Sequence, residues 1–336
     1  MGLDLLPAAN VDDGSEGVES RTVDTAVRAR PKSIVIGTEA STNGDVHLPL
    51  AALRHHTAIF AGSGSGKSVL IRRLVEEAAL QGVSSIVFDA TNDLSLLGSP
   101  WPEDDRTWPP GDANKAAAYL ADTDVVVWTP GTSSGRDLNL ATTGLAAPTD
   151  PGDLLTPIVG KRARVSVINL SGLAGDADRQ AFVRDVQAGI GAWIGNNPAA
   201  DDEVRGLLVI DEAQHLLSSG YDVTVESTLE FASQARDGGI GLIYATPSPK
   251  GVDDRIADSA STQFYGLLHS PSQVESARKL AEIKGGSVPD IGRLAAGQFY
   301  VAIEGAEFRR TVTPLCLSYH PKVSPSEDEV LELARS

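Results

Sequence analysis

The sequence predicts an α/β fold with a mostly parallel central sheet flanked by helices. Short apolar runs with the composition of buried strands alternate with longer segments of helical periodicity. One run, residues 57–60, leads through a glycine-rich loop into a helix, where Val69, Leu70 and Leu74 recur at helical spacing. Another run, residues 207–210, ends in two carboxylates, as strands do at the ligand-binding edge of a parallel sheet.

The remaining elements follow from the same alternation. Further strands are expected in runs rich in Val, Ile and Leu, at residues 85–89, 125–129, 164–170 and 240–245. Helices are expected where apolar residues recur every three or four positions or where capping signals bound a segment, at residues 176–195, 224–236, 270–283 and 327–335. Residues 98–112 and 130–160 hold several Gly and Pro residues and show little periodicity, which predicts two long connections.

Small β additions are expected near both ends of the chain. Asn43-Gly44 is a strong turn pair, and it predicts a hairpin of residues 33–36 with residues 46–50. Residues 298–303 and 308–315 predict a closing antiparallel pair.

Residues 61–68 match the phosphate-binding P-loop pattern, with only the leading glycine replaced, by Ala61. Successive glycines let backbone N–H groups converge on one point, and the following helix adds partial positive charge there, which suits a polyphosphate. Lys67 would reach the β- and γ-phosphates, and the Ser68 hydroxyl would coordinate Mg²⁺. A flexible turn would need neither Lys67 nor the flanking strand and helix. ATP is therefore expected to bind at Gly62, Ser63, Gly64, Ser65, Gly66, Lys67, Ser68 and Val69.

The acid pair Asp211 and Glu212 is the second motif that hydrolysis of a triphosphate requires. Asp211 would hold Mg²⁺ through water together with Ser68, and Glu212 would polarise the attacking water. The alternative is a strand followed by two solvated acids at a helix start, which the P-loop makes the weaker interpretation. The sequence therefore predicts an ATPase in which Lys67, Asp211 and Glu212 are catalytic.

The chain has 336 residues and a formal net charge of −17. A nucleic-acid-binding protein normally carries a basic footprint, although a few Lys and Arg side chains facing a central channel would suffice locally. The candidate clusters bring two or three basic residues close in sequence: Arg28, Arg30 and Lys32; Lys161, Arg162 and Arg164; Arg309 and Arg310. The alternative for each cluster is a solvated charged face.

The composition predicts a cytoplasmic protein without membrane contact. No apolar run approaches membrane-spanning length, and residues 1–33 lack the apolar core of a signal peptide. The single cysteine, Cys316, cannot form an intramolecular disulfide, which is typical of a reducing compartment. Three parts are expected: a peripheral segment that is partly disordered or short β (residues 1–44), an ATPase core (45–322) and a terminal helix or tail (323–336).

The order of these motifs resembles the HerA/FtsK class of ATPases and is most similar to HerA-like bacterial DNA translocases. The similarity rests on the P-loop, the strand end Phe88-Asp89, and residues 207–214, 234–246, 260–268 and 297–321. It covers most of residues 45–325. The resemblance implies a RecA-like sheet, a homo-hexameric ring and ATP-driven movement of double-stranded DNA through its centre, often beside a nuclease partner.

The resemblance also implies roles for residues outside the two nucleotide motifs. Arg236 lies where this class carries an arginine that meets nucleotide, including that of the neighbouring subunit, and there it would offset charge on the transferring phosphoryl group. Its alternative role is a cation that stabilises a helix C-terminus. Arg54 and Arg255 are weaker candidates for the same function. Asp89 either supports the metal-bound water or caps a loop.

Two departures from the family pattern stand out. The position after Thr246, which usually holds a glutamine that senses the γ-phosphate, is Pro247 and has no donor to offer. Either hydrolysis is slow or Thr246 substitutes. The second departure is that the sequence lacks the N-terminal barrel and the helical insertion of many relatives, with only a loop at residues 148–157 in place of the insertion, so either the protein is a minimal version or the sequence is a shortened one.

We therefore expect an ATP-hydrolysing, ring-forming motor that translocates double-stranded DNA, with a nuclease or defence protein as partner. The alternative is a nucleotide-gated oligomeric scaffold or regulatory ATPase of a defence or secretion complex that does not pump DNA. Stimulation by duplex DNA and a steep salt dependence of binding separate the two. A third and weaker interpretation is a small-molecule kinase that acts as a monomer.

Overall fold

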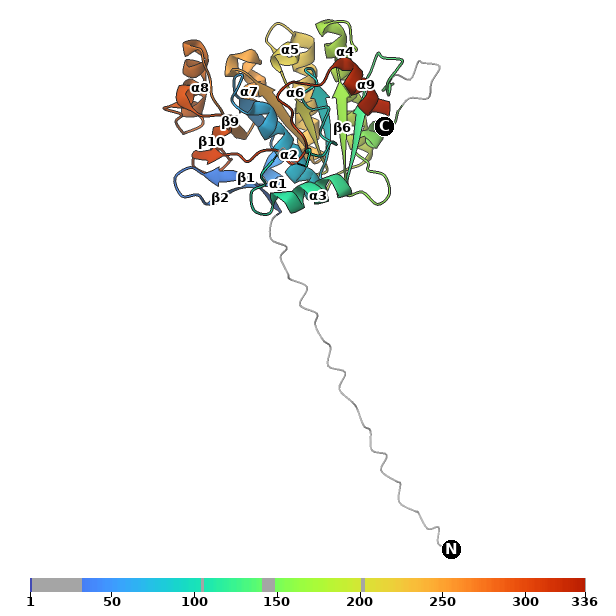
Figure 1. Ribbon diagram of the computed structural model, residues 1–336. Coiled ribbons are helices and arrows are strands. Elements are labelled where there is room, and N and C mark those ends of the chain that lie inside the picture. The colour runs from blue at the N-terminus through green and yellow to red at the C-terminus, as the bar shows by residue number, and fades with distance from the viewer. Residues whose placement is uncertain (2–31, 104–105, 141–148, 201–202, 336) are drawn as a thin grey trace. The chain divides into compact units, whose positions relative to one another are not determined.

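A sheet of eleven strands lies at the centre of the computed structural model (Figure 1). The structure describes Met1 and residues 32–103, 106–140, 149–200 and 203–335. The chain divides by its contacts into the units Met1–Arg30 and Pro31–Ser336, and the sheet belongs to the second.

Seven of the described strands pair in parallel. In spatial order they are β9 (Thr262–Tyr265), β3 (Thr57–Phe60), β8 (Ile240–Thr246), β7 (Gly206–Ile210), β4 (Ser84–Asp89), β6 (Ala163–Asn169) and β5 (Thr123–Trp128). The first five of these are buried along their whole length. Continuous burial is expected when a parallel sheet is covered on both faces, and it explains why these strands are unbroken apolar runs.

Four strands extend the sheet in antiparallel fashion beyond β9. They are β10 (Gln298–Ala302), β11 (Arg309–Val312), β1 (Ser33–Glu39) and β2 (Asp45–Pro49), in this spatial order. The predicted hairpin around Asn43-Gly44 is confirmed, since β1 pairs with β2, and so is the closing pair of β10 with β11. The boundary expected between residues 44 and 45 falls inside this hairpin, whose first strand is hydrogen-bonded to β11.

Helices cover both faces of the sheet (Figure 1). One face carries α1 (Leu50–Leu53), α2 (Lys67–Leu80), α3 (Asp112–Asp122) and α9 (Glu327–Arg335). The other carries α4 (Asp176–Asn196), α5 (Gln214–Leu217), α6 (Asp222–Asp237), α7 (Asp254–Ser259) and α8 (Pro271–Ile283). The four predicted helices correspond to α4, α6, α8 and α9. No helix in the described part of the chain is long and apolar enough to cross a membrane.

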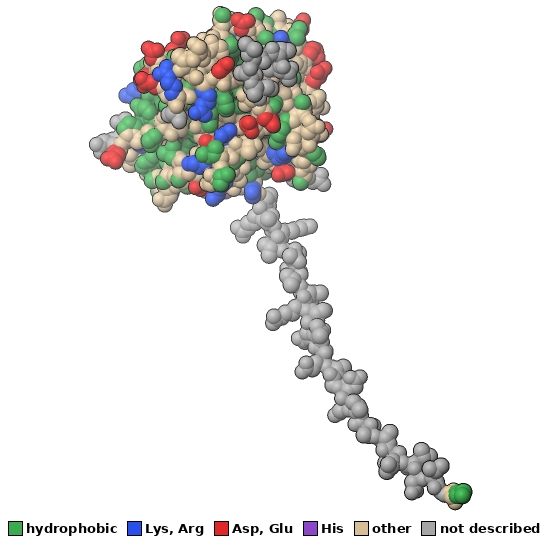
Figure 2. All heavy atoms as spheres, turned by 90° about the vertical axis from the view of Figure 1, so that its right-hand side faces the viewer, with side chains coloured by type: hydrophobic (Ala, Val, Ile, Leu, Met, Phe, Trp, Pro, Cys, Tyr) green, Lys and Arg blue, Asp and Glu red, His purple; other side chains and the backbone are tan. Residues whose placement is uncertain are grey.

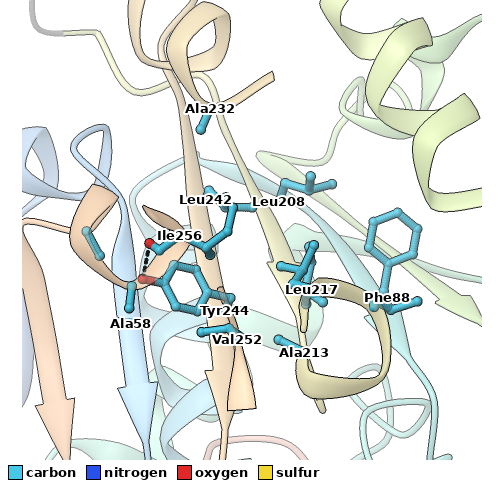
Figure 3. Close-up of a cluster of buried hydrophobic side chains, with 14 of the residues drawn as sticks. Ala58, Phe88, Leu208, Ala213, Leu217, Ala232, Leu242, Tyr244, Val252 and Ile256 are labelled. Carbon is cyan, nitrogen blue, oxygen red and sulfur yellow. Dashed lines mark hydrogen bonds between the residues drawn. The ribbon is translucent and has the colours of Figure 1, made fainter. Parts of the chain in front are cut away.

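The core beneath α6 and α7 is shown in Figure 3. Leu208 of β7 and Leu242 of β8 are fully buried there beside Tyr244, whose hydroxyl donates a hydrogen bond of 2.6 Å to the carbonyl of Ile256 in α7. Because a buried hydroxyl is costly without a partner, this bond fixes α7 against the end of β8. The ends of β7 and β8 are therefore rigidly supported from this face.

The predicted connection over residues 98–112 is an irregular segment that ends in an unpredicted helix. Only Asp112, Ala116 and Tyr119 of α3 are buried, so its sequence shows almost no apolar periodicity from which a helix could be predicted. It is held instead by a buried ion pair, because Arg73 of α2 donates to both carboxylate oxygens of Asp112, at 2.8 and 2.9 Å. The second predicted connection contains one 3₁₀ turn, Pro151–Leu154, among its described residues.

We predict that Asp112→Asn lowers the free energy of unfolding by about 3 kcal/mol, because it removes one of the two carboxylates paired with the buried Arg73 guanidinium and leaves only Glu77, which is shared with Lys115. Urea denaturation measures this. The matched control is Asp122→Asn at the other end of α3, whose pair with Arg162 is exposed and should contribute at most about 1 kcal/mol. Equal effects of the two substitutions would show that the ion pair does not anchor α3.

Candidate active site

The glycine-rich loop between β3 and α2 requires glycine at specific positions. Gly64 and Gly66 have φ angles of 73° and 87°, in the left-handed region that side chains with a Cβ atom disfavour. A Cβ added to Gly66 would also lie 2.9 Å from the backbone nitrogen of Gly297. The loop therefore turns into α2 along a path that only glycine permits at Gly66.

Two segments, one just after β9 and one just before β10, hold this loop in place. The N–H of Gly297 donates to the carbonyl of Ser65 at 2.8 Å, and the N–H of Gly62 donates to the carbonyl of Leu267 at 2.8 Å. The imidazole Nε2 of His269 lies 2.9 Å from the carbonyl oxygen of Ser63, which accepts its hydrogen bond. These bonds satisfy the loop's carbonyls and preserve its curvature without a ligand.

A cavity of about 630 Å³ opens over the loop. Its lining includes every predicted phosphate-binding residue except Ser65: Gly62, Ser63, Gly64, Gly66, Lys67, Ser68 and Val69. Ser65 is fully buried instead, below the loop. The lining also includes Asp93, Glu212, Pro247, Ala296, His320, Pro321, Lys322 and Ser324.

The strand order brings the second predicted motif to this cavity. β8 lies between β3 and β7, and because all three are parallel, the end of β7 faces the same edge as the loop. The Lys67 ammonium donates to Asp211 Oδ1 at 2.8 Å and also to the Glu212 carboxylate. Lys67, Asp211 and Glu212, predicted as one catalytic group, therefore meet in the structure.

Glu212 has a backbone conformation that is uncommon for its residue type. Its φ is 50°, in the left-handed region, which costs on the order of 1–3 kcal/mol for a residue other than glycine. The amide of Gln214 donates to the free oxygen of the Glu212 carboxylate. Gln214 was not singled out from the sequence, although it follows the acid pair by two residues, and it positions the carboxylate at the cavity.

The ion pairs shift the protonation equilibria of this group. Burial disfavours the charged form of Lys67, but the attraction of Asp211 and Glu212 exceeds this effect and raises its pKa. Burial would likewise raise the pKa of Glu212, but the Lys67 ammonium lowers it below its ordinary value. Asp211 is more deeply buried, and burial raises its pKa even beside Lys67. Lys67 and Glu212 are thus firmly ionised at neutral pH.

The donor set fits a magnesium ion held partly by phosphate. The Ser68 hydroxyl donates to Asp93 Oδ2 at 3.3 Å, and Asp211 lies on the other side of Lys67. Hydroxyl and carboxylate oxygens are the ligands Mg²⁺ prefers, and it usually binds through one or two of them plus substrate phosphates and water. The described residues contain no cluster of three or more His, Cys, Asp or Glu that could hold a metal alone.

Asp93, rather than Asp89, is the further carboxylate at the cavity. Asp89 is completely buried and accepts hydrogen bonds from the Ser95 hydroxyl at 2.7 Å and from the N–H groups of Thr91 and Leu94. Of its two expected roles, the structure therefore favours the loop cap. Burial raises the pKa of Asp89 to about 6, and the nearby charge of Asp211 contributes.

Arg236 is not brought to the loop of its own chain. It ends α6 just before β8 begins, at the sheet edge opposite to the cavity, and its side chain is exposed. Arg54 is tied to this same edge, where its guanidinium donates to the Arg236 carbonyl at 2.9 Å. Arg255 is engaged in ion pairs with Asp253 and Glu226 on the surface.

Thr246 does not lie where it could substitute for the γ-phosphate sensor that Pro247 replaces. Pro247 lines the cavity, but Thr246 is completely buried and its hydroxyl donates to the carbonyl of Ser248 at 3.2 Å. Thr246 therefore does not present its hydroxyl to the cavity. The Gln214 amide is the neutral donor that lies beside Glu212 instead.

Four of the six candidate phosphate contacts for DNA that the structure describes have local partners, and Lys32 and Arg309 are the other two. Arg164 is paired with Asp124 at 2.6 Å, Arg162 with Asp122 at 3.5 Å, and Arg310 with Asp290 at 2.9 Å. The Lys161 ammonium donates to the carbonyl of Ala121. Arg28 and Arg30 lie outside the described residues. Figure 2 shows the side of the molecule that carries α9, where the basic side chains described are interspersed with acidic ones.

The family comparison agrees with this site. The model of the HerA helicase central domain matches residues 34–105, which contain β1 to β4, the P-loop and α2. The predicted resemblance to HerA-like ATPases is confirmed. No curated protein matches the sequence.

Solved structures share the fold at low sequence identity. VirB4 of Thermoanaerobacter pseudethanolicus is 15% identical, with a TM-score of 0.53 over 85% of this chain and 97% of that one. The bacterial conjugative coupling protein TrwBdeltaN70 in complex with sulphate is 13% identical, with a TM-score of 0.51 over 89% and 92%. Its unbound form has a TM-score of 0.50 at 13% identity, over 88% and 93%. The predicted RecA-like P-loop fold is confirmed, and the match spans nearly the full length of these solved chains.

We predict a pH-dependent effect of Asp89→Asn. Because the folded-state pKa is raised to about 6, the folded protein retains a proton that the unfolded chain releases near pH 4, so the wild type loses stability as pH rises between these values. Between pH 4.5 and 7 the wild type should lose about 2 kcal/mol more unfolding free energy than Asp89→Asn, measured by urea denaturation. Parallel pH profiles would mean that Asp89 ionises normally in the folded protein.

Proposed function

We propose that this protein is an ATPase that hydrolyses ATP at the cavity over residues 61–68. The proposal rests on one observation: the Lys67 ammonium donates to both Asp211 and Glu212 beside the glycine-rich loop. A lysine ammonium beside a backbone N–H nest suits a polyphosphate, and an acid pair at the end of a neighbouring strand suits its metal and the attacking water.

The ion pairs suggest how binding prepares hydrolysis. Without ligand, the Lys67 ammonium is neutralised by the two carboxylates. When phosphate oxygens take their place on Lys67, Glu212 loses the cation that lowers its pKa and becomes a stronger base. The Gln214 amide keeps the carboxylate in position, so Glu212 can orient a water toward the γ-phosphate. Mg²⁺, held by Ser68 and by Asp211 through water, would offset the phosphate charge.

We further propose that the ATPase is the subunit of a homo-hexameric ring that translocates double-stranded DNA like a helicase, beside a nuclease or defence protein in the cytoplasm. The match to the HerA helicase central domain supports the motor class. Arg236 is exposed at the edge away from its own loop, which supports a role at the nucleotide of an adjoining subunit rather than at its own.

A second candidate is a nucleotide-gated oligomeric scaffold or regulatory ATPase that does not move DNA. The net charge of −17 and the local pairing of Arg162, Arg164 and Arg310 favour it, because an arginine already paired with a carboxylate is less available to replace counterions on a phosphate backbone. Both candidates use the same nucleotide site, so they differ only in the response to DNA.

We predict that linear duplex DNA raises the ATPase rate of the wild type and that DNA binding weakens steeply with salt. Glu212→Gln should bind ATP with unchanged affinity but lower kcat by about 100-fold or more, because the water loses its base. Lys67→Ala should abolish nucleotide binding. ATPase assays with and without DNA, together with mass determination, test these points.

Two results separate the proposals. Normal turnover in Glu212→Gln would refute its role as base. If duplex DNA leaves the basal rate of ATP hydrolysis unchanged, the motor proposal fails and the scaffold takes its place.

We predict that Arg236→Ala retains nucleotide affinity and lowers kcat about 1,000-fold, as expected for an arginine that stabilises charge on the transferring phosphoryl group. Mixing it with Glu212→Gln subunits should restore activity, since an intact arginine then faces an intact Glu212 across some interfaces. The control is Arg255→Ala, whose ion pairs lie on the surface. Failure of the mixture to exceed the sum of its parts would show that Arg236 does not act between subunits.

A further inference from the structure

The cavity over the P-loop has a second wall built from a distant part of the chain. Residues 317–325, here called the C-terminal strap, follow β11 and cross α2 to reach α9, which packs against β5 at the other end of the sheet (Figure 1). Four strap residues line the cavity together with the P-loop: His320, Pro321, Lys322 and Ser324. A ligand bound to the loop therefore lies against the strap as well.

Two buried charges on the P-loop helix hold the start of the strap. The Glu76 carboxylate accepts the N–H groups of Leu317 and Ser318 at 2.6 and 2.8 Å. The Arg72 guanidinium, one turn earlier on α2, donates to the Ser318 hydroxyl at 2.8 Å and to the carbonyl of Tyr319 at 2.5 Å. Arg72 and Glu76 are both fully buried, and such charges are tolerated only when they are fully partnered. The strap is therefore a fixed wall.

The far end of the strap is tied beside Ser68. Asp93 accepts the Ser68 hydroxyl on Oδ2 and the Ser324 hydroxyl on Oδ1, and Asn92 donates to the carbonyl of Pro325 at 2.9 Å. Glu212 instead contacts Lys67, and it marks the γ-phosphate end of the cavity. The strap thus bounds the cavity beyond the P-loop, and among the described residues that line the cavity only His320 carries a planar ring.

We propose that the C-terminal strap is the nucleoside-binding wall of the site and that His320, with Pro321, supplies the flat surface on which the nucleotide base stacks. This inference rests on the proposed ATPase function and adds the residues that recognise the non-phosphate part of the ligand. The His320 ring has no hydrogen bond within the described parts of the chain, so its face is not committed elsewhere. Burial and the nearby Arg72 charge lower its pKa, which keeps the imidazole neutral and suited to stacking on a neutral base.

Calorimetric titration with two probes tests the wall: a non-hydrolysable ATP analogue and inorganic tripolyphosphate, which lacks the nucleoside. His320→Ala should weaken binding of the ATP analogue about five- to tenfold and leave tripolyphosphate unchanged, because base stacking contributes on the order of 1 kcal/mol or more. His320→Phe should retain the ATP affinity, since it keeps a flat ring. Val323→Ala is the matched control on the same strap, where the side chain is 79% exposed and does not line the cavity.

The outcomes separate the nucleoside-binding wall from the ATPase function on which it rests. Unchanged ATP binding in His320→Ala, or equal weakening of both probes, would overturn the nucleoside wall while the phosphate site stands. Lys67→Ala should weaken the binding of both probes, because Lys67 contacts the phosphates that the two probes share. If the wild type binds neither probe, the ATPase proposal itself fails.

Discussion

The ion pair between Lys67 and the two carboxylates after β7 is the interaction on which the site depends. Lys67 and Asp211 are 144 residues apart in the chain, and only the parallel sheet brings them within 2.8 Å. β3 and β7 both end at this edge, with β8 between them. A one-residue shift of β7 would move Asp211 off the strand end and turn its side chain to the opposite face. Strand register is thus a functional constraint here as well as a structural one.

This arrangement also limits which ligand can enter. The carboxylates of Asp211 and Glu212 lie beside a loop whose backbone N–H groups suit an anion. A triphosphate without a cation would therefore be repelled by Glu212 as well as attracted by Lys67. A divalent cation bound to the phosphates removes that conflict, and the Ser68 hydroxyl and Asp93 lie where it would be received. The charge pattern therefore favours the metal complex of the nucleotide over the free nucleotide.

Much of this could be predicted from the sequence, because the parallel strands are continuous apolar runs and the P-loop is a local pattern. Residues 57–60 and 240–245 could be predicted as strands because burial on both faces favours apolar residues. α3 escaped prediction because tertiary ion pairs, rather than an apolar stripe, hold it. Asp89 and Asp93 illustrate the same limit within the site. Asp89 ends β4 and Asp93 follows it, and only the path of the loop decides that Asp89 is buried as a cap and Asp93 faces the cavity.

The strap carries a consequence for biosynthesis. Arg72 and Ser318 are separated by 246 residues, and among the described residues the Glu76 carboxylate accepts hydrogen bonds only from Leu317 and Ser318. While a ribosome is still translating the intervening strands, this carboxylate on α2 lacks its native donors, and long-range closure of this kind is slow. The wall that the strap contributes to the cavity can therefore be completed only after translation has passed residue 325.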